Sequence, residues 1–202
     1  MRRAIEPGAP AVWPEQPGNV AVDQALGDKA EVDAIFAKAH RTVGLTIENN
    51  RVITNYMEPR AAIAEYDAGR KAFKLSVSSQ GVHGLRDTLA KQVLRIAPDK
   101  LHVVTGDVGG GFGTKSFCYR EYALLAEAAK RLKRPVKWIA DRSDHFVSDA
   151  HGRDNIAKAE VACDRSGKFL AMRFDVLANL GGYLSQYGPY IPYLGVSMMT
   201  GV

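Results

Sequence analysis

The residues best suited to act together in chemistry are the five glycines within positions 106–115, which read Gly106-Asp-Val-Gly-Gly-Gly-Phe-Gly-Thr-Lys115. Glycine lets the backbone adopt positive φ and lets a ligand approach the N–H groups, because no Cβ stands in the way. An apolar run precedes this loop and a helix-like segment follows it. A turn from a strand into a helix points several N–H donors at one spot, so the loop could hold an anion such as a phosphate.

The loop matches neither of the common phosphate-binding motifs. Both G-x-G-x-x-G and G-x-x-x-x-G-K-[ST] would require glycine at position 114, and threonine occupies it. The alternative is a tight turn with close strand–helix packing. The loop therefore predicts a binding site without naming the ligand.

Gln80 is a second candidate, because its neutral amide can both donate and accept hydrogen bonds. It lies between an expected strand and an expected helix, as the glycine loop does further along the chain. Two junctions of the same kind could bring Gln80 and the loop to one site. The alternative is a glutamine that caps a helix, which the spacing alone favours.

An acidic and histidine-containing stretch, Asp141-Arg-Ser-Asp-His-Phe146, is followed by Asp149, His151 and Asp154. It has neither H-E-x-x-H nor C-x-x-C spacing, so no metal-ligand template fits it. We interpret it as a loop of ion pairs.

Three further polar residues, Cys118, Glu58 and Glu121, are candidates for a chemical role. Cys118 lies near an expected helix N-terminus, where a thiolate is favoured, although a small buried residue is the commoner occupant of such a position. Glu58 and Glu121 have no visible partner carboxylate. None of the three is predicted to be catalytic.

The 202-residue chain has the composition of an ordinary globular protein, with 46% apolar and 24% charged residues. Its net charge of +5 is scattered, and the one basic cluster, Lys130-Arg-Leu-Lys-Arg134, has no aromatic neighbours. Nucleic-acid binding is therefore disfavoured. Two cysteines indicate a reducing compartment, hence the cytoplasm, and no signal peptide follows Met1.

Hydrophobic periodicity predicts an α+β fold with mixed sheets and two strand–loop–helix units. The expected helices are 28–40, 82–93 and 117–134, and the expected strands are 43–47, 52–53, 61–66, 71–77, 101–104, 136–139, 155–163 and 168–178. Parallel strands on either side of the glycine loop would make a right-handed crossover. Residues 1–27, rich in proline and glycine, are expected to form an extended arm.

The C-terminal stretch has no ionisable acid or base after Asp175 apart from tyrosines. Gly188, Pro189, Pro192 and Gly195 argue against a membrane helix. We expect a surface outside this chain to cover the stretch in a longer parent protein. In the isolated chain we expect the stretch to be disordered or packed against a second copy of the chain.

Four motifs together resemble a known family. They are Met57-Glu-Pro-Arg-Ala-Ala-Ile-Ala-Glu-Tyr-Asp67, Ser79-Gln80-Gly81, the loop Gly106–Lys115 and His151-Gly-Arg-Asp154. In this order they resemble the molybdenum-binding large subunit of the xanthine dehydrogenase and aldehyde oxidase superfamily. The aerobic carbon monoxide dehydrogenase large chain is the most similar branch.

The resemblance implies a site. Gln80 matches the glutamine whose amide faces the apical oxygen of molybdenum, and it is the one catalytic residue expected here. Gly110, Gly111, Phe112 and Gly113 match the loop that approaches the metal and pterin through backbone groups. Gln80 and Phe112 would lie near molybdenum without being direct ligands. Residues 28–202 would be the first part of a larger molybdopterin-binding domain, truncated at its C-terminus.

The resemblance also implies a function. The parent subunit would bind molybdenum as molybdopterin cytosine dinucleotide. It would oxidise a small carbon substrate (carbon monoxide, an aldehyde or an N-heterocycle) with water as oxygen source. Its partners would be a 2Fe-2S subunit and a FAD subunit, without nucleic acid or membrane.

This chain departs from the family by its length. The glutamate base and the loop for a copper-binding cysteine would lie beyond Val202, so Cys118 does not inherit the copper role. Ser116 after the loop lysine argues against a purine substrate. The chain alone is expected to be inactive and free of cofactor. The alternative function is a stand-alone nucleotide-phosphate-binding module that uses the loop Gly106–Lys115.

Overall fold

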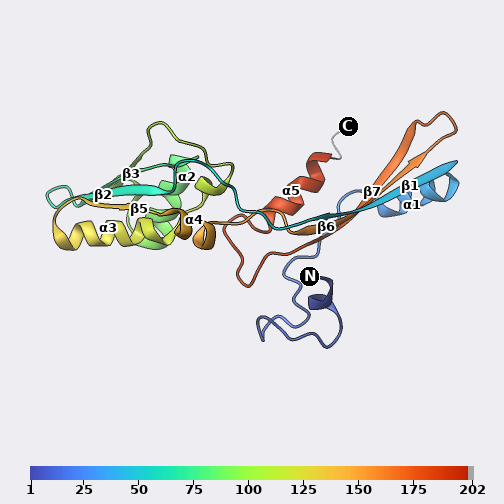
Figure 1. The fold of residues 1–202 in the computed structure, drawn as a ribbon, viewed down its shortest axis with the longest axis horizontal. Helices are drawn as coiled ribbons and strands as arrows, with labels where there is room; N and C mark the ends of the chain where they lie inside the picture. The colour runs from blue at the N-terminus through green and yellow to red at the C-terminus, as the bar shows by residue number, and fades with distance from the viewer. Residues whose placement is uncertain (200–202) are drawn as a thin grey trace. The chain divides into compact units, whose positions relative to one another are not determined.

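The computed structural model describes residues 1–199, and the chain forms two compact units (Figure 1). One unit is Ile53–Gly152. The other joins Met1–Val52 to the described residues from Arg153 onward. The first is thus inserted into the second along the chain.

The unit Ile53–Gly152 contains a four-stranded sheet in the order β4-β3-β2-β5. The strands are β2 (Ala61–Asp67), β3 (Ala72–Val77), β4 (Leu101–Val104) and β5 (Val136–Ile139). β2 pairs antiparallel with β3 and with β5, whereas β3 and β4 are parallel neighbours. All four strands and the β2–β3 hairpin were predicted, and the mixed sheet confirms the α+β class.

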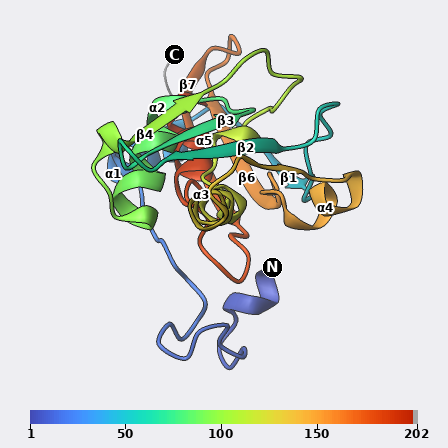
Figure 2. The ribbon, with the colours of Figure 1, turned by 90° about the vertical axis from the view of Figure 1, so that its left-hand side faces the viewer.

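Helices cover one face of this sheet (Figures 1 and 2). α2 (Val82–Asp87) continues as a π-helix to Leu94, and α3 (Arg120–Leu132) packs chiefly on β2. The core between the helices and the sheet is made of buried apolar side chains: Ala62, Ala64, Phe73, Leu75, Val77, Leu85, Leu89, Ala90, Leu101, Val103, Tyr122, Leu125, Ala126 and Ala129.

α3 differs from its prediction at both ends. It begins at Arg120, because Thr114–Ser116 form a 3-10 turn and Phe117 has extended backbone. Leu132, expected on the apolar face, is 60% exposed in the last turn. The burial of Tyr122, Leu125, Ala126 and Ala129 follows the predicted stripe.

The parallel pairing of β3 and β4 positions the site. The carboxyl ends of parallel neighbours meet at one sheet edge, so Gln80, just after β3, and the loop after β4 lie together. β5 runs in the same direction as β4, since both β3 and β5 are antiparallel to β2. β4 and β5 nevertheless occupy opposite edges, so the connection through α3 crosses two intervening strands.

The other unit is built on an antiparallel sheet, β1-β6-β7. Its strands are β1 (Arg41–Asn49), β6 (Asn155–Cys163) and β7 (Phe169–Ala178). The hairpin of β6 and β7 and the strand at 43–47 are confirmed. The strand expected at 52–53 is wrong: Val52 makes only an isolated bridge and Ile53 is irregular.

Helix α1 (Lys29–Lys38) begins as predicted at Asp28, whose side chain accepts a hydrogen bond from Glu31 N at 3.0 Å. Arg173 of β7 pairs with Asp33 at 3.3 Å and stacks on Phe36, so α1 lies on the face of the sheet that carries Arg173. The opposite face is apolar. By register it presents Val43, Leu45, Ile47, Ala157, Ala159, Val161, Met172, Phe174 and Val176.

The arm contains a short 3-10 turn, Arg2–Ile5, and is largely exposed. Trp13 Nε1 donates to the carbonyl of Gly182 at 2.7 Å, and its ring meets Tyr183 edge-on. The C-terminal stretch forms α5 (Tyr190–Met199), and positions 200–202 lie outside the described residues. None of the helices in the described part of the chain combines the length and apolar character needed to cross a bilayer.

Candidate functional site

The two junctions predicted from the sequence do meet, and Gln80 bonds directly to the glycine loop. Its Oε1 accepts hydrogen bonds from the N–H groups of Gly113 at 2.9 Å and Lys115 at 3.1 Å. Its own backbone N–H donates to the carbonyl of Lys115 at 3.1 Å. Gln80 does not cap α2, whose N-cap is Gly81 without a side-chain bond. The capping alternative is therefore wrong.

Glycine is required at positions 110, 111 and 113 of the loop for two different reasons. Gly110 and Gly113 adopt φ of +90° and +95°, which side chains rarely allow. A Cβ on Gly111 would lie 2.8 Å from Gln80 Cδ, so Gly111 is needed for close approach. Phe112, which lies between Gly111 and Gly113, also has a positive φ of +48°, and the residue is 75% exposed.

Glu58 and Lys115 form an ion pair at the base of the loop. Lys115 Nζ lies 2.7 Å from Glu58 Oε2 and 4.6 Å from the ring centroid of Tyr56, with the lysine side chain fully buried. The same carboxylate oxygen accepts hydrogen bonds from Ser78 Oγ and Gly109 N, both at 2.8 Å. Burial opposes ionisation of Glu58, but these hydrogen bonds outweigh it and lower the pKa of the carboxyl below its usual value.

Several loop N–H groups are already satisfied by protein acceptors. Gly109 donates to Glu58, and Gly113 and Lys115 donate to Gln80. In the described part of the chain the N–H groups of Gly110, Gly111 and Phe112 have no such acceptor. The loop thus offers backbone donors along its central stretch, residues 110–112.

A second polar cluster centres on Arg60, which is fully buried. Its Nε lies 2.6 Å from Asp149 Oδ1, and its NH1 and NH2 donate to Glu121 and Ser148 at 3.1 Å each. The guanidinium also stacks 3.7 Å above the ring of Tyr119. Burial opposes the charge, yet the hydrogen bonds to Glu121 and Asp149 raise the pKa of Arg60.

Asp149 extends this cluster to Tyr56 and His145. Its Oδ2 accepts from the Tyr56 hydroxyl and lies 2.8 Å from His145 Nδ1. Burial, with the neighbouring carboxylate, raises the pKa of Tyr56. Glu58 and Glu121, which had no visible partner in the sequence, each pair with a buried cation.

The interpretation of residues 141–146 as a loop is wrong, because they enter helix α4 (Arg142–Ser148). Asp141 and Asp144 form a reciprocal capping box at its start. Within the described residues no group of three potential ligands is placed to hold a metal ion. Burial raises the pKa of Cys118, so its thiol and not a thiolate is favoured.

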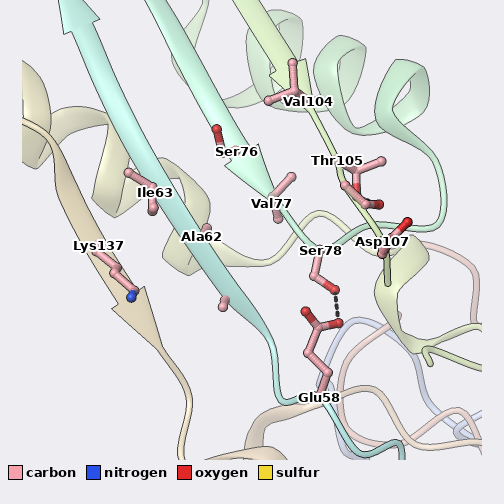
Figure 3. Close-up of a pocket in the computed structure, with 12 residues that line it drawn as sticks. Glu58, Ala62, Ile63, Ser76, Val77, Ser78, Val104, Thr105, Asp107 and Lys137 are labelled. Carbon is pink, nitrogen blue, oxygen red and sulfur yellow. Dashed lines mark hydrogen bonds between the residues drawn. The ribbon is translucent and has the colours of Figure 1, made fainter. Parts of the chain in front are cut away.

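A cavity of about 360 Å³ opens on the sheet face opposite the helices. Figure 3 shows Glu58 and Ser78, joined by their hydrogen bond, at one end, with Thr105 and Asp107 nearby. Ile63 and Lys137 line it along β2 and β5. The Glu58 carboxylate therefore lies between this cavity and the glycine loop.

The chain matches known proteins in sequence and in fold. A family model described as a molybdopterin cofactor-binding domain matches residues 12–202. The chain is 33% identical over 170 residues to the carbon monoxide dehydrogenase large chain of Hydrogenophaga pseudoflava, covering 84% of this chain and 21% of that one. It is 30% identical over 182 residues to the nicotine 6-hydroxylase large subunit of Paenarthrobacter nicotinovorans, covering 90% and 22%.

Solved structures agree. Carbon monoxide dehydrogenase from Oligotropha carboxidovorans superimposes with a TM-score of 0.69 at 34% identity, over 75% of this chain and 19% of that one. Aldehyde oxidoreductase from Desulfovibrio gigas gives 0.73 at 28% identity, over 86% and 19%.

The fold and the loop thus define a cofactor-binding segment of the molybdenum hydroxylase class. The chain belongs to the molybdopterin cofactor-binding domain family. The resemblance to the carbon monoxide dehydrogenase and xanthine dehydrogenase group is confirmed. The chain spans about a fifth of the length of the curated relatives it matches.

Proposed function

We propose that this chain is the part of a molybdenum hydroxylase large subunit that meets the molybdenum cofactor through Gln80 and residues 110–113. The observation that carries this proposal is the orientation of the Gln80 amide. Its oxygen faces two backbone N–H donors at 2.9 and 3.1 Å. The amide nitrogen must then point away from the loop, as a donor toward any bound group.

The loop fits a group that needs backbone donors. The N–H groups of Gly110, Gly111 and Phe112 are without acceptors in the described residues. Gly111 has no Cβ, which would otherwise contact Gln80. The backbone beside the Gln80 amide is therefore open to a ligand. A pterin and its pyrophosphate need such donors and not a cationic side chain, and Lys115 is turned inward to Glu58.

Each residue then has a defined task. Gln80 Nε2 would donate a hydrogen bond to the bound cofactor. Phe112, with 75% of its surface exposed, would lie next to the molybdenum of the bound cofactor. Neither is a metal ligand. The cofactor, when bound, supplies two-electron oxidation of a small carbon substrate with water as the oxygen source.

The parent enzyme is proposed to use the cytosine dinucleotide form of molybdopterin and to pass electrons to 2Fe-2S and FAD subunits in the cytoplasm. Carbon monoxide, an aldehyde or an N-heterocycle would be its substrate. Within this chain, residues 1–27 would serve as an arm, and 28–202 as the first part of the domain. The general base would come from residues outside it.

Purification of the full-length subunit in its complex tests the function. Metal analysis should find molybdenum in the subunit, and nucleotide analysis after acid release should find CMP. A dye-reduction assay should respond to one of the three substrate classes. A complex that carries no molybdenum would refute the proposal.

The stand-alone nucleotide-phosphate module has less support. The Lys115 amine, which would have to neutralise a phosphate in such a module, is bonded to Glu58. The Glu58 carboxylate at the base of the loop would also repel an anion placed on Lys115.

A further inference from the structure

One carboxylate oxygen, Glu58 Oε2, collects three donors at the base of the glycine loop. They are Lys115 Nζ at 2.7 Å, Ser78 Oγ at 2.8 Å and Gly109 N at 2.8 Å. Gly109 and Lys115 lie on either side of residues 110–113 in the sequence. A single side chain therefore holds both ends of the segment assigned to the cofactor.

At the N-terminal end of this segment, Glu58 forms hydrogen bonds with both backbone groups of Gly109. Its N–H donates to Glu58 Oε2, and its carbonyl accepts from Glu58 N at 3.2 Å. A Cβ on Gly109 would lie 2.5 Å from Glu58 Cβ, closer than real atoms approach. The loop and Glu58 are therefore in direct contact.

At the C-terminal end of this segment, Lys115 connects Glu58 to Gln80. The lysine side chain reaches Glu58, while its backbone N–H donates to Gln80 Oε1 and its carbonyl accepts from Gln80 N. Moving Lys115 must therefore move Gln80. Glu58 is connected to the Gln80 amide by two consecutive bonded contacts.

Stability alone is a weak reason for this arrangement. The Lys115 side chain has no exposed surface and has lost its hydration, whereas 39% of the Glu58 side chain is exposed. The cost of desolvating the lysine offsets much of the attraction between the two charges. The ion pair does something that an apolar pair cannot, because the Glu58 carboxylate accepts from the Gly109 N–H and the Lys115 amine together.

We propose that Glu58 is a positioning residue for the cofactor: through Gly109 and Lys115 it fixes the position of residues 110–113 and the orientation of the Gln80 amide. This rests on the proposed function. Glu58 itself touches neither substrate nor cofactor.

The test replaces the ion pair by apolar residues, Glu58→Leu with Lys115→Met, in the full-length subunit. Hydrogen–deuterium exchange of the loop peptide in the cofactor-free protein reports the hold directly. We expect its protected amides to exchange roughly tenfold to a hundredfold faster, the factor carried by a hydrogen bond to a charged group. Molybdenum content should fall by a similar factor, about ten to a hundred, as for residues that support a metal's ligands.

Gly109→Ala is an independent perturbation of the same contact without any change of charge. Its Cβ would push the loop from Glu58 and should give the same faster exchange and lower molybdenum content. The matched controls are Glu65→Gln, which breaks the exposed pair with Lys74 on the same sheet, and Gly84→Ala, which has open space around it. Both should leave exchange in the loop and molybdenum content unchanged.

The outcomes distinguish the positioning role of Glu58 from the proposed cofactor-binding function of the chain. A thermal midpoint near that of the parent, with faster loop exchange and lost molybdenum, supports positioning. Unchanged exchange and molybdenum content in the double variant would overturn it. If the double variant does not fold, Gly109→Ala decides by the same two readouts. A parent complex without molybdenum refutes the proposed function, while the exchange experiment still measures whether Glu58 holds the loop.

Discussion

Gln80 Oε1 lies 2.9 Å from the backbone nitrogen of Gly113, although the two residues belong to different strand-to-helix junctions. An amide oxygen that faces backbone N–H groups cannot be exchanged with its nitrogen without placing donors against donors. The contact therefore fixes which end of the amide is presented outward. Gln80 can offer only hydrogen-bond donors to a ligand beside the loop.

Substitutions of Gln80 test the roles of its amide oxygen and its amide nitrogen separately. Gln80→Glu keeps an acceptor for Gly113 and Lys115 but replaces the outward donor by a carboxylate oxygen. Molybdenum content should stay near that of the parent, while kcat falls by on the order of a hundredfold or more, as when one preorganised donor is removed. Metal analysis with steady-state kinetics on the full-length enzyme measures both. Parental kcat in Gln80→Glu would show that the outward donor has no role.

Gln80→Ala removes both ends. Its turnover should be impaired as in Gln80→Glu, and its loop should in addition exchange faster, because Gly113 and Lys115 lose their acceptor. Loop protection equal to that of the parent would mean that other contacts hold the loop.

Gly111→Ala should imitate the loss of Gln80. The new Cβ would stand 2.8 Å from Gln80 Cδ, so the amide must turn away from the loop. We expect kcat to fall by roughly tenfold to a hundredfold, and the effect to be non-additive with Gln80→Ala, since contacting residues couple. Kinetics of the two single variants and the double variant measure the coupling. Strict additivity would place the effect of Gly111 elsewhere.

The sequence was informative where local rules decide. Asp28 caps α1, and the Asp67-Ala-Gly69 turn closes the β2–β3 hairpin as predicted. The junctions at Gln80 and Phe112 were placed correctly because alternating apolar residues ended in glycine each time. Their meeting required the parallel pairing of β3 and β4, which two separate junctions could only suggest.

The sequence did not predict the polar contacts between residues that are far apart in the chain. Arg60 and Asp149 are far apart in the chain, and nothing in their spacing announces a fully buried pair. Glu58 showed no partner carboxylate because its partner is the lysine of the glycine loop. The segment from Asp141 was interpreted as a loop because Asp141 and Asp144, which form the capping box of α4, differ from the usual S/T-x-x-E/Q signature.

Arg60 should be necessary for stability and not for chemistry. Arg60→Met would leave Asp149 buried without its cation, and removing one member of a buried pair typically costs about 3–5 kcal/mol. Urea unfolding of the subunit should show the loss. Arg70→Met, at an exposed position, is the control and should be nearly neutral. A midpoint for Arg60→Met equal to that of Arg70→Met would mean that the cluster contributes nothing net.

The acid dependence of stability should contain a contribution from Glu58. Its folded pKa is lowered below the usual value of a glutamate: burial opposes the charge, but hydrogen bonds from Lys115, Ser78 and Gly109 N–H outweigh it. A carboxyl with a lowered folded pKa stabilises the protein fully above its unfolded pKa. That contribution disappears as the pH falls through the folded value.

Glu58→Gln should therefore lower the thermal midpoint of the subunit most at neutral pH. The gap between parent and variant should narrow as the pH falls below about 4.5, because the parent carboxyl then becomes protonated as well. Thermal midpoints of both proteins across this range measure the gap, with Glu65→Gln as an exposed control whose gap stays small throughout. A gap that is constant from neutral to acid pH would show that the Glu58 charge contributes nothing to stability. The loss in Glu58→Gln would then come from altered packing at the base of the loop.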